Sequence, residues 1–131
     1  MVENRTTDGK RIAQLLSSEV DGREDSGLAA LAVTDADPDV EPSADGELAY
    51  RITYVDSDDV LADVFVHDER VRIEFREGID AAAETASEGD LRVRPKAVEP
   101  PRTLVFVEDG GEVKRAVDAL VAALEVGDDA R

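Results

Sequence analysis

The chain has 131 residues, of which 32 are acidic and 15 basic, so its formal net charge is −17. This length is typical of a single domain, and the 42% of hydrophobic residues fall in periodic runs, which predicts a folded protein rather than a disordered one. The absence of cysteine excludes disulfides and thiolate chemistry within the chain. Because no segment reaches roughly 18 apolar residues and no early apolar run suits a signal peptide, we expect a cytoplasmic protein.

The basic residues are mostly arginine: Lys10, Lys96 and Lys114 are the only lysines. An excess of Asp and Glu, few lysines, abundant Ala and Val, and no Cys or Trp resemble the proteome of an extremely halophilic archaeon. Molar salt would reconcile the charge with folding, because the Debye length falls to roughly 3 Å at about 1 M and surface carboxylates then repel one another weakly. The alternative is an acidic protein that mimics or binds a basic partner. The spread of acidic residues along the whole chain favours the halophilic interpretation.

The first third of the chain predicts one helix, one ambiguous segment and a loop. Apolar residues at spacings of three and four predict a helix from Thr7 or Asp8 to about Arg23, which we expect to lie on a sheet. Residues 28–34 fit either a strand from about Ala30, which we favour, or a further helical turn. Residues 35–46 form an acidic loop broken by two prolines.

The middle of the chain predicts three strands joined by short turns, at residues 47–55, 60–66 and 70–76. In the first of them, alternation places Arg51 and Thr53 on one face, opposite Leu48, Tyr50, Ile52 and Tyr54. Turns of two to four residues make this unit an antiparallel meander.

The last third predicts a short helix at 79–86, a strand at 91–94, a strand at 103–107 and a helix at 113–124 that Gly127 stops. The strand at 103–107 is apolar on both faces, as expected of a strand covered on both sides or held in a tight interface.

Together these elements predict an α+β fold, a single antiparallel or mixed sheet of five to six strands with three helices. We expect one domain over residues 1–131, with residues 1–6 and 127–131 disordered. The element order, the length and the acidity resemble the fold of class I type III secretion chaperones. That resemblance implies a small acidic dimer that binds extended segments of partner proteins. It is one of architecture only, and no motif assigns the chain to a family of known function.

Two glycines, Gly110 and Gly111, precede the last helix in the arrangement that cradles phosphate in other proteins. Here Glu108, Asp109 and Glu112 surround them, and three carboxylates exclude an anion. Asp109 followed by Glu112 three residues later instead predicts a capping box.

No other motif predicts a metal, cofactor or catalytic site. The acidic loop begins like a calcium loop at Asp35, but Val40 and Gly46 stand where that loop needs a glycine and a bidentate glutamate. His67, the only histidine, has no nucleophile assigned to it, and we expect it to be exposed in a turn. One histidine without cysteine lacks the usual zinc ligands.

The arginines form the one pattern that suggests a binding surface. Eight cations lie on polar positions of the predicted strands or at the proline-rich corner before residue 103: Arg51, Arg70, Arg72, Arg76, Arg92, Arg94, Lys96 and Arg102. In one interpretation they form cross-strand ion pairs with carboxylates such as Asp63 and Glu74. In the other they dock an acidic partner surface or a phosphate backbone. The residue pattern favours ion pairing, since only Phe65 adds an aromatic ring to that face.

We therefore expect a non-enzymatic, chaperone-like module for protein binding or assembly, acting as a homodimer. A nucleic-acid-associated protein that uses the arginine face is the alternative. An enzyme with Asp or Glu chemistry is a third possibility, but no pair of carboxylates is singled out by spacing. No cofactor, membrane or small-molecule substrate is indicated.

Overall fold

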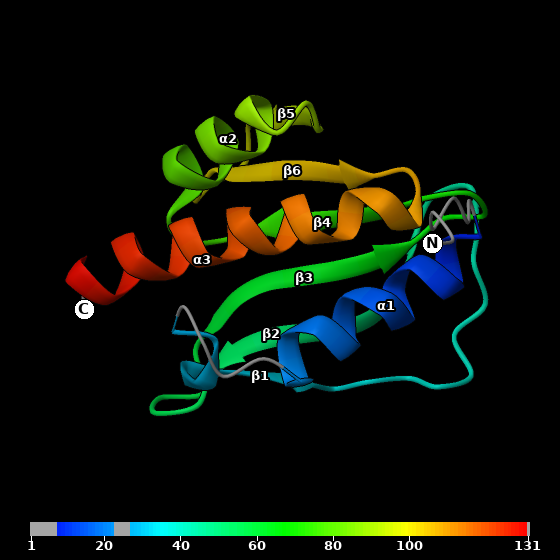
Figure 1. Cartoon of the computed structure of the whole chain (residues 1–131), viewed down its shortest axis with the longest axis horizontal. Helices are drawn as coiled ribbons and strands as arrows, with labels where there is room; N and C mark the ends of the chain where they lie inside the picture. The colour runs from blue at the N-terminus through cyan, green and yellow to red at the C-terminus, as the bar shows by residue number, and fades with distance from the viewer. Residues whose placement is uncertain (1–7, 23–26, 131) are drawn as a thin grey trace.

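The computed structural model describes residues 8–22 and 27–130. Within them, helices pack on one face of a six-stranded antiparallel sheet (Figure 1), which confirms the predicted α+β class. The helices are α1 (Gly9–Gly22), α2 (Ile79–Glu88) and α3 (Val113–Ala130), with short 3-10 helices η1 (Leu28–Ala30) and η2 (Gly110–Glu112). The strands are β1 (Leu31–Thr34), β2 (Glu47–Tyr54), β3 (Val60–Val66), β4 (Val71–Phe75), β5 (Arg92–Lys96) and β6 (Arg102–Val107).

The sheet runs in the order β1-β2-β3-β4-β6-β5, and every neighbouring pair is antiparallel. The predicted meander is confirmed as β2, β3 and β4. After β4 the chain forms α2, reaches the sheet edge as β5 and returns as β6 between β5 and β4. Strand β6 therefore lies inside the sheet although it is last in sequence.

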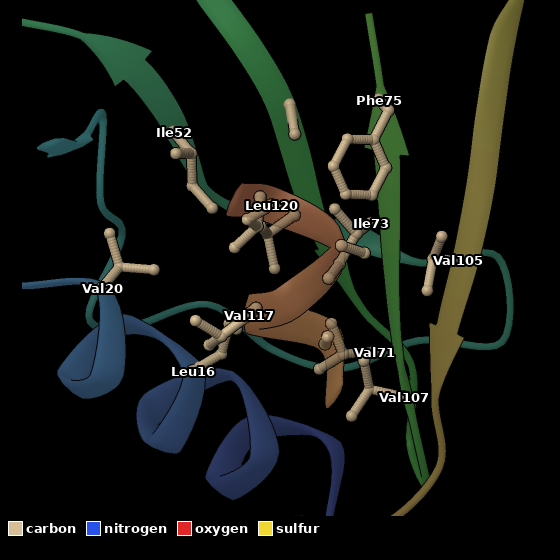
Figure 2. Close-up of a cluster of buried hydrophobic side chains, with 14 of the residues drawn as sticks. Leu16, Val20, Ile52, Val71, Ile73, Phe75, Val105, Val107, Val117 and Leu120 are labelled. Carbon is tan, nitrogen blue, oxygen red and sulfur yellow. The ribbon is translucent and has the colours of Figure 1, made fainter. Parts of the chain in front are cut away.

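The hydrophobic core lies between the sheet and the helices. Figure 2 shows Ile52, Ile73 and Phe75 pointing from the strands toward α3, whose Val117 and Leu120 meet them. From α1, Leu16 and Val20 complete this layer. All of these side chains are buried. The alternation of the strands thus sends one set of residues into the core and the other set to the opposite face.

Residues 28–34 combine both interpretations of the sequence. Gly27, with φ of 85°, precedes a single 3-10 turn, and the chain then extends into β1. The expectation that Leu48 and Tyr50 lie on the same face of the strand is wrong. Leu48 lies opposite Phe65 and Tyr50 opposite Val64, because a β-bulge at Ala49 inserts one residue and reverses the alternation.

Two further predictions concern the chain ends and β6. The expectation that Gly127 stops the last helix is wrong, because α3 continues to Ala130, and one glycine costs a helix only about 1 kcal/mol. The expected disorder of residues 127–131 stays a prediction. The predicted disorder of residues 1–6 lies outside the described residues. Strand β6 is covered by helices on one face only, since α1, α2 and α3 all lie on the same side of the sheet.

Candidate interaction surface on the open face of the sheet

We call the face of the sheet opposite the three helices the open face. Because Ile52, Ile73, Val105 and their neighbours point to the helices, the residues that alternate with them point away. The strand register places Arg51 opposite Asp63, and Arg72 opposite both Phe65 and Phe106. On the outer strands, Arg92 lies opposite Phe106, Arg94 opposite Leu104 and Lys96 opposite Arg102. The pairing order thus gathers the predicted cations on one surface.

Two buried carboxylates, Asp63 and Glu74, lie at the centre of the open face, with side chains only 2% and 3% exposed. Asp63 accepts hydrogen bonds from Arg51 Nε at 3.0 Å, Arg76 Nε at 2.8 Å and Arg102 Nη1 at 3.4 Å. Glu74 accepts from Arg72 Nε at 2.9 Å, Arg102 Nη1 at 3.0 Å and Lys96 Nζ at 3.2 Å. We call these seven residues the arginine–carboxylate network.

The network keeps Glu74 charged although it is buried. Burial alone would raise the pKa of Glu74, but hydrogen bonds from Arg102 and Lys96 and the charge of Arg72 outweigh it, and the pKa is lowered. Arg102 joins the two carboxylates, since its Nη1 contacts both. The ion pairing predicted for five of the eight candidate cations is therefore confirmed. However, five cations share two buried carboxylates, and among the described residues their only further carboxylate partner is Asp35, which is 3.0 Å from Arg51.

The other three candidates, Arg70, Arg92 and Arg94, lie on the β4–β6–β5 part of the open face and contact neither Asp63 nor Glu74. The guanidinium carbon of Arg70 lies 4.8 Å from the centre of the Phe106 ring, and that of Arg92 lies 6.0 Å from it. Arg92 is 3.6 Å from the half-exposed carboxylate of Glu108. Arg94 is exposed and forms no ion pair with any described residue. We call these the outer arginines.

Sequence reasoning missed Phe106, because it expected only Phe65 as an aromatic on this face. Arg72 covers Phe65, with its guanidinium carbon 4.4 Å from the ring centre. Phe106 is 7% exposed, because Arg70 and Arg92 cover its ring in the same way. The sequence did contain a signal for Phe106. Residues 103–107 are apolar on both faces, and alternation must place either the odd-numbered or the even-numbered residues of this strand on the open face.

His67 is buried at the end of β3, which contradicts the expected exposed turn residue. Ala44 O lies 3.0 Å from its Nδ1, and Arg72 Nη1 lies 3.0 Å from its Nε2. Burial lowers the pKa of His67, and the nearby charges of Arg72 and Arg70 lower it further. A neutral ring whose Nδ1 donates to Ala44 and whose Nε2 accepts from Arg72 fits all of these contacts. His67 was misjudged because the acidic loop, distant in sequence, folds over it.

A surface depression of about 320 Å³ adjoins His67 and is lined by Ala44, Asp68, Glu69 and Arg70 besides the histidine. In the described part of the chain, no serine, threonine or cysteine lines this depression as a nucleophile beside the histidine. Among the residues that the structure describes, no group of three His, Asp or Glu side chains is placed to hold a metal ion. The carboxylates of the acidic loop serve the fold instead: Asp37 Oδ1 accepts from Asp39 N at 3.0 Å, and Asp35 pairs with Arg51.

The Gly110–Gly111 segment forms a helix cap, as predicted. Asp109 Oδ1 accepts from Glu112 N at 3.1 Å, and Glu112 Oε1 accepts from Glu108 N at 2.8 Å. This reciprocal pair satisfies the free N–H groups where η2 leads into α3. No helix in the described parts of the chain is both long and apolar enough to cross a membrane.

Comparison with known proteins assigns a family but no activity. No curated protein matches the chain, and no solved structure matches it. A family model described as a family of unknown function (DUF7993) matches residues 1–131. The chain therefore belongs to the DUF7993 family.

Proposed function

We propose that this protein is a non-enzymatic binding module whose open face docks an acidic surface of a partner protein. The observation that carries the proposal is the local reversal of charge. Among the described residues, the eight cations of the open face have only four carboxylates as ion-pair partners, Asp35, Asp63, Glu74 and Glu108, and Arg70 and Arg94 form no ion pair, whereas the whole chain has a net charge of −17. A cationic surface on a strongly acidic protein attracts negative charge where the rest of the molecule repels it.

Two observations favour a protein partner over a nucleic acid. The aromatic rings of the open face, Phe65 and Phe106, are covered by arginines, so they offer no free platform on which a base can stack. The element order, which resembles that of type III secretion chaperones, supports a protein partner as well.

We propose further that the protein works in the cytoplasm of a halophile. The support is compositional: the acidic excess, the scarcity of lysine and the absence of cysteine. In molar salt, purely ionic docking weakens, so apolar contacts must contribute to partner binding.

A capture experiment tests the proposed function. The tagged chain is incubated with lysate of its native host at native salt, and the captured protein is purified and rebound. The variant Arg70→Ser/Arg92→Ser/Arg94→Ser should lose the partner. The control variant Arg11→Ser/Lys114→Ser/Arg115→Ser removes the same charge from exposed positions of α1 and α3 and should retain it. Equal loss in both variants, or in neither, contradicts docking at the open face. Retention of nucleic acid that depends on the outer arginines would favour the alternative.

The homodimer stays a prediction. The strand that suggested it is accommodated within one chain, because Val105 and Val107 enter the core while Leu104 and Phe106 lie among arginines. Light scattering after size exclusion in about 3 M KCl decides the point: twice the mass of the chain supports the dimer, and the mass of one chain rejects it.

A further inference from the structure

The open face is not uniform, and its two parts differ in what they offer a partner. In the arginine–carboxylate network, each cation already donates to a carboxylate that is almost fully buried. The buried carboxylates fix the positions of these cations, and the hydrogen bonds of the cations are directed toward the sheet. The outer arginines lack such a buried partner. Arg92 has only Glu108, at 3.6 Å and 43% exposed, and an exposed pair of this kind contributes little.

The outer arginines surround an apolar centre. Arg94 lies opposite Leu104 and Arg92 opposite Phe106, so two cations of the edge strand flank two apolar residues of β6. On the other side, Arg70 covers Phe106. Leu104 is half-buried, and no helix of the described chain covers this face. An apolar centre with arginines at its rim is the usual composition of a protein-binding surface.

The sheet edge beside this surface is poorly suited to adding a strand. Strand β5 contains Pro95 as its fourth residue, and proline has no N–H to donate to a neighbouring strand. The flanking Arg94 and Lys96 carry like charges, which also protect an edge from pairing. A partner therefore docks on side chains of the face rather than by extending the sheet.

We infer that the occupant of this surface is an acidic protein segment, which pairs its carboxylates with Arg70, Arg92 and Arg94 and places an apolar side chain on Leu104. This inference rests on the proposed function and names the chemistry of its partner. Guanidinium groups bind carboxylates through paired hydrogen bonds, and the charge of the surface is complementary to such a segment. A second copy docked face to face would instead oppose two sets of outer arginines, which charge repulsion disfavours.

The test uses the isotopically labelled full chain and nuclear magnetic resonance, in a KCl concentration at which the protein is folded. The probe is a short peptide of glutamates around a central leucine. Three comparison probes are the same peptide with glutamines, the same peptide with serine in place of leucine, and an oligothymidine of equal charge. The glutamate–leucine peptide should shift the side-chain N–H signals of Arg70, Arg92 and Arg94 and the backbone amides of β5 and β6. The glutamine peptide should not bind, and the serine peptide should bind several-fold more weakly.

Variants locate the contact. The outer-arginine triple variant should weaken binding by about tenfold or more, as the loss of three exposed ion pairs predicts, and the triple control on α1 and α3 should change it less than about twofold. The single variant Arg94→Glu, at an exposed position that contacts no carboxylate, tests the same surface with least risk to folding and should also weaken binding.

Each contrary outcome overturns the inference in a distinct way. Absence of shifts with every peptide rejects an acidic segment, while partner capture that still depends on the outer arginines leaves the proposed function standing. Tighter binding of oligothymidine identifies a phosphate-binding face. Shifts of the same amides on raising the protein concentration without any probe identify a second copy as the occupant.

Discussion

At the scale of single residues, Asp63 and Glu74 determine how the open face is built. A carboxylate that is 2% or 3% exposed has lost its hydration and needs charged donors in place of water. Here five cations supply those donors from four strands, β2, β4, β5 and β6. The arginines are therefore held in place before any partner arrives, which lowers the conformational entropy that binding must overcome.

Glu74→Gln should destabilise the protein by roughly 2–3 kcal/mol, because hydrogen bonds to a charged acceptor are lost and three cations lose their buried counter-charge. Urea unfolding at fixed KCl measures the change. The matched control is Glu108→Gln, since Glu108 is 43% exposed and pairs with Arg92 at 3.6 Å; it should cost less than about 1 kcal/mol. Equal effects of the two substitutions would show that burial of Glu74 has no energetic consequence.

The lowered pKa of Glu74 also predicts how stability responds to acid. Its ordinary value is 4.5, and the folded value is lower. Glu74 therefore contributes its full stabilisation above about pH 4.5 and loses it as the pH falls through its folded pKa. Urea midpoints measured from neutral pH downward should fall more steeply below pH 4.5 in the wild type than in Glu74→Gln. Parallel curves for the two proteins would contradict this linkage.

At the scale of elements, local sequence patterns predicted most helices and strands, and close packing between elements determined the rest. The periodicities of α1, α3 and the meander arise from contacts that are near in sequence, so they could be predicted. The bulge at Ala49 could not, because it depends on how β2 pairs with β3. The packing of α2 on α3 depends on a glycine whose role is equally non-local, Gly78.

Gly78→Ala should destabilise the protein by about 2 kcal/mol or more. Gly78 has φ of +59°, which costs a residue with a side chain about 1–2 kcal/mol. An added Cβ would also lie 2.5 Å from the backbone oxygen of Ala123, so α2 and α3 would have to separate. Thermal or urea unfolding measures the loss.

Gly22→Ala is the control for this substitution, because no atom of the described residues lies within 4 Å of a Cβ added there. It should be neutral or stabilise α1 by up to about 1 kcal/mol. A destabilisation by Gly78→Ala no larger than the effect at Gly22 would contradict the close approach of α2 to α3.

At the scale of the whole molecule, the charge is divided between two unlike regions. The open face concentrates cations, whereas the remaining surface carries the excess of acidic residues. Repulsion within that acidic surface opposes folding, and salt screens it. The buried network is screened much less, so salt should relieve the repulsion more than it weakens the ion pairs.

The urea midpoint should therefore rise with KCl and level off near about 1 M, where the Debye length is roughly 3 Å. The variant Asp118→Asn/Glu125→Gln removes two exposed charges from α3 and should depend less on salt than the wild type. A midpoint that is independent of KCl, or that falls as KCl is added, would contradict both the repulsion and the proposed halophilic origin.

The sequence by itself determined the α+β class, the approximate position of each element and the cap at Asp109. These properties follow from composition and from patterns with periods of two and 3.6 residues, which are local. Only the tertiary structure decided that Asp63 and Glu74 are shared by five cations, that His67 is buried and that Phe106 lies beneath two arginines. Each of these contacts depends on strand order and register, above all on the return of β6 between β4 and β5, and such long-range pairing leaves no periodic signal in the sequence.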